Sequence, residues 1–186
     1  MNKDEIALYI KEGSDIRLDS DIENIYNIGI IISKVMAKGG KLLIMGNGGS
    51  AADAQHIAAE LVGRFEKERR SLPAIALHGN TSSLTAIAND YGYEHVYERQ
   101  IEAFAKPGDL VIGISTSGNS KNILLAMAKA KALGCITVGM TGKDGGKLTE
   151  VSDYIFKTNS KRTSLIQEVH IAVGHIWSKM VEDIIT

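Results

Sequence analysis

A histidine and a glutamate lie four residues apart in the segment AADAQHIAAEL, at His56 and Glu60. In an α-helix this spacing puts the two side chains on one face, about 6 Å apart. An imidazole and a carboxylate at that separation can share a metal ion, or they can form an ordinary surface pair. The other residues of the segment are mostly small and apolar, and a glycine-rich turn precedes it. This setting favours the metal-site interpretation.

A second group of reactive side chains lies near the end of the chain, in IQEVHIAVGHIW, which contains Gln167, Glu168, His170 and His175. His175 has apolar neighbours on both sides, so we expect it to be at least half buried and to need a polar partner. Two imidazoles, a carboxylate and an amide oxygen would form a reasonable zinc site. Gln167 and His175, however, are separated by about 12 Å along a continuous helix. A site that uses both requires an irregular helix or a second subunit, and His170 is a competing ligand.

The glycine-rich turn GNGGS (46–50) offers free backbone N–H groups to an anion at the start of a helix. It does not match the dinucleotide pattern G-x-G-x-x-G, and it lacks the lysine of a P-loop. A tight turn with Ser50 near a helix cap explains the pattern almost as well as a ligand site does.

The segment STSGNS (115–120) carries four hydroxyl groups at the start of another predicted helix. A helix cap needs only one hydroxyl, so the composition favours a phosphate site built from neutral donors. The segment TGKDGGK (141–147) is a weaker candidate and is better explained as a plain glycine-rich connection. His78 and His95 lie in loop-like segments, where we expect solvated or substrate-edge side chains without an assigned role.

Short apolar runs alternate with helical stretches through the middle of the chain. Strands are predicted at 41–45, 73–77, 109–114, 135–140 and 153–157. All but the last lack polar–apolar alternation, which is typical of strands buried on both faces of a parallel sheet. Helices are predicted between them at 50–62, 81–104 and 119–132. The pattern predicts a three-layer α/β/α fold with a doubly wound, five-stranded parallel sheet, whose strand ends carry the glycine-rich and hydroxyl-rich loops.

Further helices are predicted at both ends of the chain, at 4–17, 20–38 and 163–185. Ser20 and Glu23 form a capping-box pattern at the start of the second, and KGG (38–40) ends it. These helices are apolar, so they either complete the core or pack on a second subunit. The chain therefore reads as one domain over 1–186, with amino-terminal helices at 1–38, an α/β core at 41–160 and a carboxy-terminal helix at 163–185.

Composition narrows the classes of function. The net charge of −1 over 186 residues gives no electrostatic reason to expect nucleic acid or an anionic membrane as a partner. The single cysteine, Cys135, excludes an internal disulfide, and its apolar neighbours indicate a buried, inert thiol. Charges interrupt the apolar runs at the amino terminus, so no signal peptide is expected there and the predicted location is the cytoplasm.

Five segments, in this order, resemble the sedoheptulose 7-phosphate isomerase (phosphoheptose isomerase) family within the sugar-isomerase (SIS) fold. They are GNGGSAADAQHIAAEL, AIANDYG (86–92), GISTSGNS, TGKDGG and IQEVHIAVGH. The resemblance covers about residue 20 to the end. It implies a flavodoxin-like SIS fold and a cytoplasmic homotetramer with active sites at subunit interfaces. The implied reaction converts D-sedoheptulose 7-phosphate to D-glycero-D-manno-heptose 7-phosphate, the first step toward ADP- or GDP-activated heptoses.

The resemblance also implies roles for individual residues. It implies one zinc ion per subunit, bound by His56, Glu60, Gln167 and His175. It implies that the substrate phosphate is bound by Ser115, Thr116, Ser117 and Ser120. Further substrate contacts are implied for Asn47, Gly48, Gly49, Ser50, Arg64, Asn89, Asp90, Thr163 and Gln167. Two positions depart from the family pattern: Leu165 replaces a frequent arginine, and Ser164 replaces an aspartate of some members, so that no proton transfer is available there.

Our mechanistic hypothesis is an aldose–ketose isomerisation through a cis-enediol(ate) stabilised by zinc as a Lewis acid. Glu60 is the predicted base and His175 the predicted acid, although Glu60 would then serve as metal ligand and base together. A non-catalytic tetrameric adaptor that binds the replication initiator is one alternative, and an isomerase of another sugar phosphate is a second. The presence of His56, Glu60 and His175 together favours an enzyme, because an adaptor would have no need of them.

Overall fold

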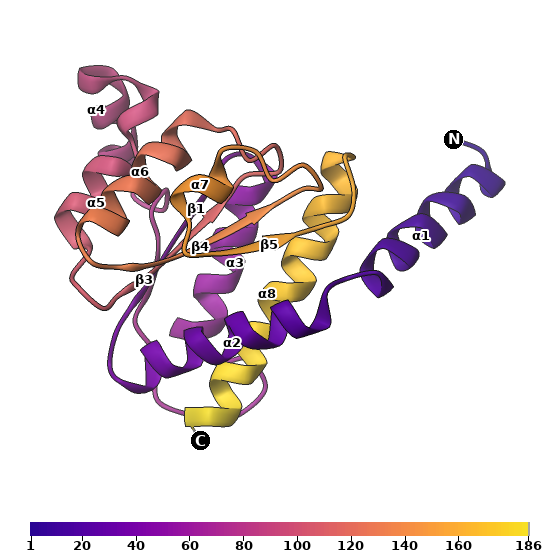
Figure 1. The fold of residues 1–186 in the computed structure, drawn as a ribbon, viewed down its shortest axis with the longest axis horizontal. Helices are drawn as coiled ribbons and strands as arrows, with labels where there is room; N and C mark the ends of the chain where they lie inside the picture. The colour runs from indigo at the N-terminus through magenta and orange to yellow at the C-terminus, as the bar shows by residue number, and fades with distance from the viewer. Residues whose placement is uncertain (186) are drawn as a thin grey trace.

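Five parallel strands form one sheet in the order β2-β1-β3-β4-β5 (Figure 1). The structure, a computed structural model, describes residues 1–185, so Thr186, the last residue of the predicted domain, lies outside the described residues. The strands are β1 (Leu42–Gly46), β2 (Ala74–Ala76), β3 (Leu110–Ile114), β4 (Ile136–Thr141) and β5 (Tyr154–Lys157). This order is that of flavodoxin-like doubly wound folds, and it confirms the predicted fold class.

The two central strands, β1 and β3, lie side by side in register from Leu42 opposite Leu110 to Gly46 opposite Ile114. Every residue of both strands is buried. The prediction that these strands are covered on both faces, made from their lack of polar–apolar alternation, is therefore confirmed. β5 lies at the edge of the sheet, where Tyr154 and Lys157 are exposed.

Helices cover both faces of the sheet (Figure 1). One face, with Leu42, Ile44 and Ile112, packs against α2 (Ile22–Ala37), α3 (Gly49–Val62) and α8 (Thr163–Ile185). The other face, with Leu43, Met45 and Val111, is covered by five shorter elements. These are α4 (Thr81–Tyr91), the 3-10 helix η1 (Tyr93–His95), α5 (Glu98–Phe104), α6 (Lys121–Ala132) and α7 (Leu148–Val151).

Two local predictions are wrong. The single helix predicted over 81–104 is divided into α4, η1 and α5, because Gly92 adopts a left-handed conformation (φ 92°) that ends α4. The capping box of Ser20 and Glu23 does not form, since Asp21 is the N-cap of α2 and accepts the N–H of Asn24. The glycine stop after α2 is confirmed, with Gly39 at φ 83°.

The terminal helices behave in two different ways. α2 and α8 complete the core, and the indole of the buried Trp177 in α8 donates to the Ile25 carbonyl of α2 (2.9 Å). α1 (Lys3–Leu18) instead projects from the body of the protein (Figure 1). It leaves four large apolar side chains exposed: Ile6, Leu8, Ile10 and Leu18. No helix of residues 1–185 is long and apolar enough to cross a membrane.

His170 lies in the core and not beside the other histidine of α8. Its side chain is fully buried, Nε2 lies 3.2 Å from the Thr141 carbonyl of β4, and the Phe156 ring packs edge-on against it. Burial lowers the pKa of His170 to about 4, and the bond to Thr141 offsets this only in part. His170 is therefore a neutral core residue that faces the sheet.

The buried His170 predicts an acid-dependent loss of stability. The unfolded chain binds the proton on His170 near pH 6.5, and the folded chain binds it only near pH 4. The contribution of the neutral His170 to the free energy of unfolding is therefore fully present above pH 6.5 and is lost as the pH drops toward 4. A shift of this size corresponds to about 3 kcal/mol. We expect His170→Gln to remove most of this slope in urea unfolding measured across that range. His95→Gln, at a half-buried surface position, is the control, and an unchanged slope in His170→Gln would contradict the assignment.

Candidate functional site

The glycine-rich turn and the hydroxyl-rich loop meet at one edge of the sheet. The turn joins β1 to α3, and the loop (115–120) joins β3 to α6. β1 and β3 are neighbours, but their helices cover opposite faces of the sheet. Such a switch point is where open α/β sheets bind ligands.

A pair of amides ties these two connections together. Asn47 and Asn122 each donate an amide N–H to the other's carbonyl oxygen, at 3.0 and 2.9 Å. The hydroxyl of Tyr93 also donates to Asn47 (3.2 Å), and that of the buried Tyr97 donates to the Gly46 carbonyl (2.5 Å). Asn122 and Tyr93 were not predicted. Asn122 could have been found, because it occupies the apolar stripe of α6, four residues before the buried Ala126.

The hydroxyl-rich loop is compact, and the segment 141–147 packs against it. Ser115 is buried and its hydroxyl bonds that of Ser120 (3.0 Å), while Thr116 and Ser117 are more open. A Cβ on Gly118 (φ 66°) would lie 2.0 Å from the Gly145 carbonyl oxygen, so only glycine fits. The segment 141–147 thus packs against this loop. A cavity of about 300 Å³ beside it is lined by Thr116, Ser117, Asn119, Lys143, Asp144, Ser160 and Lys161.

The turn at the start of α3 lies against α8. Gly48 is exposed at φ 55°, and a Cβ on Gly49 would lie 2.6 Å from Nε2 of Gln167. The same nitrogen lies 3.5 Å from the hydroxyl of the buried Ser50. Gln167 therefore faces the beginning of α3, next to the predicted substrate residues.

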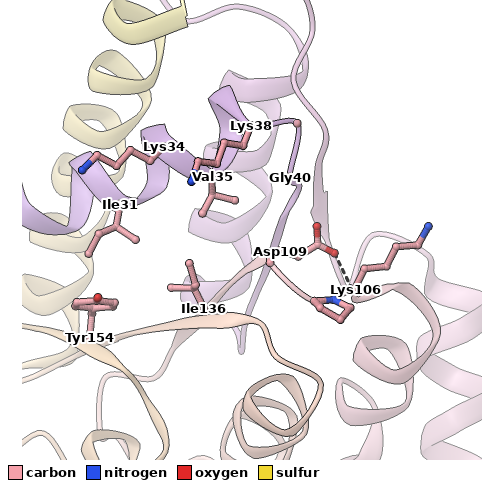
Figure 2. A pocket seen from close by; sticks show the side chains of 12 residues that line it. Ile31, Lys34, Val35, Lys38, Gly40, Lys106, Asp109, Ile136 and Tyr154 are labelled. Atoms are coloured by element: carbon pink, nitrogen blue, oxygen red, sulfur yellow. Dashed lines mark hydrogen bonds between the residues drawn. The ribbon is translucent and has the colours of Figure 1, made fainter.

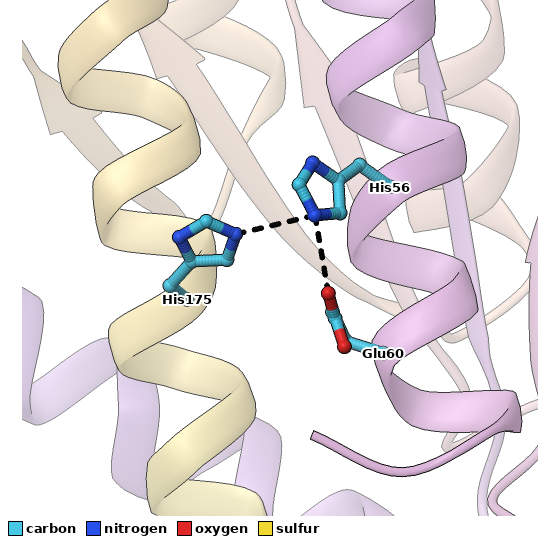
Figure 3. Close-up of side chains that lie close together, drawn as sticks. All are labelled: His56, Glu60 and His175. Carbon is cyan, nitrogen blue, oxygen red and sulfur yellow. Dashed lines mark hydrogen bonds and ion pairs between the residues drawn. The ribbon is translucent and has the colours of Figure 1, made fainter. Parts of the chain in front are cut away.

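Further along the two helices, three side chains converge to form what we call the His–Glu–His cluster: His56, Glu60 and His175 (Figure 3). Nε2 of His56 lies 3.1 Å from Oε1 of Glu60 and 3.4 Å from Nε2 of His175. One ligand atom from each residue lies within 4.8 Å of the other two. A close helix contact permits this, since a Cβ on Gly174 would lie 2.5 Å from Cδ1 of Ile57.

The cluster fits a zinc ion by both its chemistry and its spacing. Zn–N and Zn–O bonds of about 2.1 Å at tetrahedral angles place neighbouring donor atoms about 3.4 Å apart. The separations of His56 from Glu60 (3.1 Å) and from His175 (3.4 Å) are close to that value. Three protein donors also leave one position open, as in catalytic zinc sites. The sequence predicted these three residues, and the structure brings them together.

Gln167, the fourth predicted ligand, is placed differently. α8 is unbroken from Thr163 to Ile185, so the irregular helix considered from the sequence is wrong. The Gln167 amide contacts Ser50, which precedes His56 by six residues, or about 9 Å of helix rise.

Two neighbours of the cluster had no predicted role. The ring of Phe65 stacks on that of His175, with centroids 5.6 Å apart at 26°. Asp53 lies on α3 one turn before His56, and its Oδ2 is buried without a hydrogen-bond partner among the described residues. Burial raises the pKa of Asp53 to about 6, against the opposing charge of His56. The spacing of three residues from His56 was the available signal for Asp53.

Four further predicted substrate residues are exposed: Arg64, Asn89, Asp90 and Thr163. Nε of Arg64 lies 3.9 Å from Glu68, and Asn89 donates to Asp90 (2.8 Å) at the end of α4. Their substrate contacts stay predictions.

The structure also shows the surroundings of the other residues discussed from the sequence. Leu165, at the departure from the family pattern, is fully buried beside Gly13 of α1, which indicates a packing role, whereas Ser164 is exposed. Both ring nitrogens of the half-buried His78 are buried, so the first of its two expected settings, a solvated side chain, is wrong, and His95 bonds Glu98 (2.8 Å). Cys135 is buried as predicted, and burial raises the pKa of its thiol.

A cavity of about 620 Å³ lies at the opposite edge of the sheet, where β1 and β3 begin (Figure 2). Ile31, Val35 and Ile136 line it between α2 and the sheet, and Lys34 and Lys38 lie at its rim. Lysines at the end of a helix compensate its negative dipole, which accounts for these two. No residue predicted to bind substrate or metal lines this cavity.

The chain is similar to proteins of one known family. The family model of the SIS domain matches residues 10–142. The phosphoheptose isomerase of Aquifex aeolicus is 48% identical over 185 residues, covering 98% of this chain and 97% of that one. The probable phosphoheptose isomerase of Thermoplasma acidophilum is 54% identical, over 94% of this chain and 96% of that one.

Two solved structures share the fold of this chain. The phosphoheptose isomerase of Neisseria gonorrhoeae superposes with a TM-score of 0.91 at 36% identity, covering 97% of this chain and 98% of that one. That of Francisella tularensis gives 0.94 at 31% identity, over 98% and 100% of the two chains. The chain therefore belongs to the phosphoheptose isomerase family of SIS-domain proteins and is a sugar-phosphate isomerase.

Proposed function

We propose that this enzyme converts D-sedoheptulose 7-phosphate to D-glycero-D-manno-heptose 7-phosphate in the cytoplasm, as the first step toward activated heptoses. The observation that carries the proposal is the convergence of His56, Glu60 and His175 on α8 and on α3, the helix that begins at the glycine-rich turn of the switch point. The relatives' printed name, phosphoheptose isomerase, supports a heptose phosphate as the substrate.

The proposal assigns the two ends of the substrate to different parts of the site. The hydroxyls of Ser115, Thr116, Ser117 and Ser120 bind the phosphate, as neutral donors at the start of α6. The turn with Asn47 and Ser50 contacts the sugar. Binding energy from the distant phosphate then orients the reacting carbons toward the His–Glu–His cluster.

One zinc ion per subunit would be held by His56, Glu60 and His175, with the amide oxygen of Gln167 contributed by a second subunit. Bound there, zinc would supply a Lewis acid that polarises the substrate's carbonyl. The spacing of the donor atoms supports zinc at this cluster.

The chain's own groups move the protons. Glu60 takes a proton from C1 of the ketose and returns it to C2, while His175 moves a proton from the hydroxyl on C1 to the oxygen on C2. The two oxygens of Glu60 can divide its two roles. Oε1 faces His56, which leaves Oε2 for proton transfer (Figure 3).

We further infer a homotetramer in which subunit contacts complete the active site. The exposed apolar residues of α1 support an interface on that helix. Ile176, which follows His175, is 45% exposed, and a cavity of about 320 Å³ beside the cluster is lined by Phe65, Glu66, His175, Ile176, Lys179 and Met180. An apolar surface next to a reactive histidine is consistent with a neighbouring subunit there.

Purified protein with zinc should form an aldose from sedoheptulose 7-phosphate, and a chelator should abolish the reaction until zinc is restored. Product formation is followed by NMR of the aldose anomeric proton, with hexose and pentose phosphates as comparison substrates. Turnover of one of those in place of sedoheptulose 7-phosphate would reject the substrate assignment.

Glu60→Gln should lower turnover by about 10²-fold or more, because the amide cannot accept the proton. Binding of the sugar phosphate, measured by calorimetry, should persist because the phosphate loop is unchanged. Glu98→Gln, at a glutamate that pairs with His95, is the matched control. Full activity of Glu60→Gln would rule out Glu60 as the base.

Leu8→Glu should weaken the assembly, since Leu8 is 66% exposed on α1 and would be buried at the proposed interface. Light scattering should give about four times 20.1 kDa for the native protein and less for the variant. Lys3→Glu on the same helix controls for the introduced charge. A monomeric native protein would contradict the tetramer.

A further inference from the structure

A fully buried carboxylate, Glu182 of α8, holds the segment that follows α3. Glu182 is 0% exposed. The backbone N–H of Phe65 donates to its Oε1 (2.7 Å), and those of Glu66 and Lys67 donate to its Oε2 (2.9 and 3.0 Å). Burial raises the pKa of Glu182, but these three donors and the charge of Arg69 outweigh it and hold the pKa below its usual value. Glu182 is therefore an ionised anchor inside the protein.

Arg69 connects this anchor to the end of α3. Its side chain is 1% exposed, and Nε lies 3.4 Å from Oε1 of Glu182. The guanidinium also donates to the carbonyls of Glu60 (2.6 Å), Leu61 (2.8 Å) and Gly63 (3.0 Å), which the helix itself leaves unpaired. Glu182 and Arg69 thus join α8 to the last turn of α3, the turn that carries Glu60.

The same anchor sets the position of Phe65. Its N–H makes the shortest of the three bonds to Glu182, and its ring stacks on His175, two turns earlier on α8. An aromatic ring stacked in this way restricts the orientation of the imidazole. A continuous series of contacts thus links Glu182 to the Phe65 backbone and the Phe65 ring to His175.

We propose that Glu182 is a positioning residue for the isomerase site, which acts through Phe65 to fix the orientation of His175 in the His–Glu–His cluster. The proposal rests on the proposed function, because it concerns that cluster as the metal and proton-transfer site. Outer residues that orient metal ligands typically change metal affinity or activity by about 10- to 100-fold when they are replaced.

The test uses the full-length protein and two variants, Glu182→Gln and Phe65→Leu. Asp183→Asn is the matched control, because Asp183 pairs with Lys67 of the same segment but lies at the surface. The histidine ring signals of the metal-free protein are recorded by NMR, and zinc affinity is measured against a competing chelator. Circular dichroism and thermal unfolding identify the folded variants.

Both variants should shift the ring signals of His175 and raise the zinc Kd by about 10- to 100-fold. Signals of His170 and His95 should not move, and Asp183→Asn should behave as the native protein. A folded Glu182→Gln protein with native His175 signals and zinc affinity would overturn the proposal. If that variant does not fold, Phe65→Leu decides the matter, since it keeps the carboxylate and its donors, and native behaviour there would also overturn it.

Failure of the proposed function has a different signature. A native protein without activity on sedoheptulose 7-phosphate, in which both variants still shift His175 and weaken zinc binding, would reject the substrate and keep the positioning role. An active native protein in which neither variant shifts the His175 signals or weakens zinc binding would keep the substrate and reject the positioning role.

Discussion

The candidate site depends on how closely α3 and α8 approach each other. Gly174 has no Cβ, and one built there would lie 2.5 Å from Ile57, so a larger residue would push the helices apart. His175 follows Gly174 and His56 precedes Ile57, so this contact sets the 3.4 Å separation of the two imidazoles. Every property attributed to the cluster, from donor spacing to proton transfer, requires this packing. The buried Glu182 and Arg69 hold the same two helices further along.

The central sheet fixes the points at which the two loops of the candidate site begin. β1 and β3 are buried along their full length and pair in a single register, which fixes their position relative to each other. The glycine-rich turn and the hydroxyl-rich loop therefore start from fixed points. The amide pair of Asn47 and Asn122 then joins the two, so the proposed substrate end of the site is held by hydrogen bonds between side chains.

Much of this arrangement could be predicted, because strong local patterns encode it. Apolar runs predicted the strands, and the spacing of His56 and Glu60 identified two of the three residues of the cluster. The partnership with His175 needed the resemblance to a known family, since a single sequence does not reveal which helices touch. The break at Gly92 was not predicted, because a single glycine in a sequence does not show by itself that its backbone adopts a positive φ. Glu182 and Arg69 resembled ordinary surface charges in the sequence, and only their burial shows otherwise.

One unbroken helix carries Gln167 against the turn, His175 in the cluster, Trp177 in the core and Glu182 at the anchor. These four contacts lie along α8 in a fixed angular order, with about 100° of rotation per residue. An insertion or deletion of a single residue between Gln167 and Glu182 would turn one end of that series away from its partners. The length of this segment is therefore constrained more strictly than the identity of most of its residues, and natural variation in length should be confined to the loops.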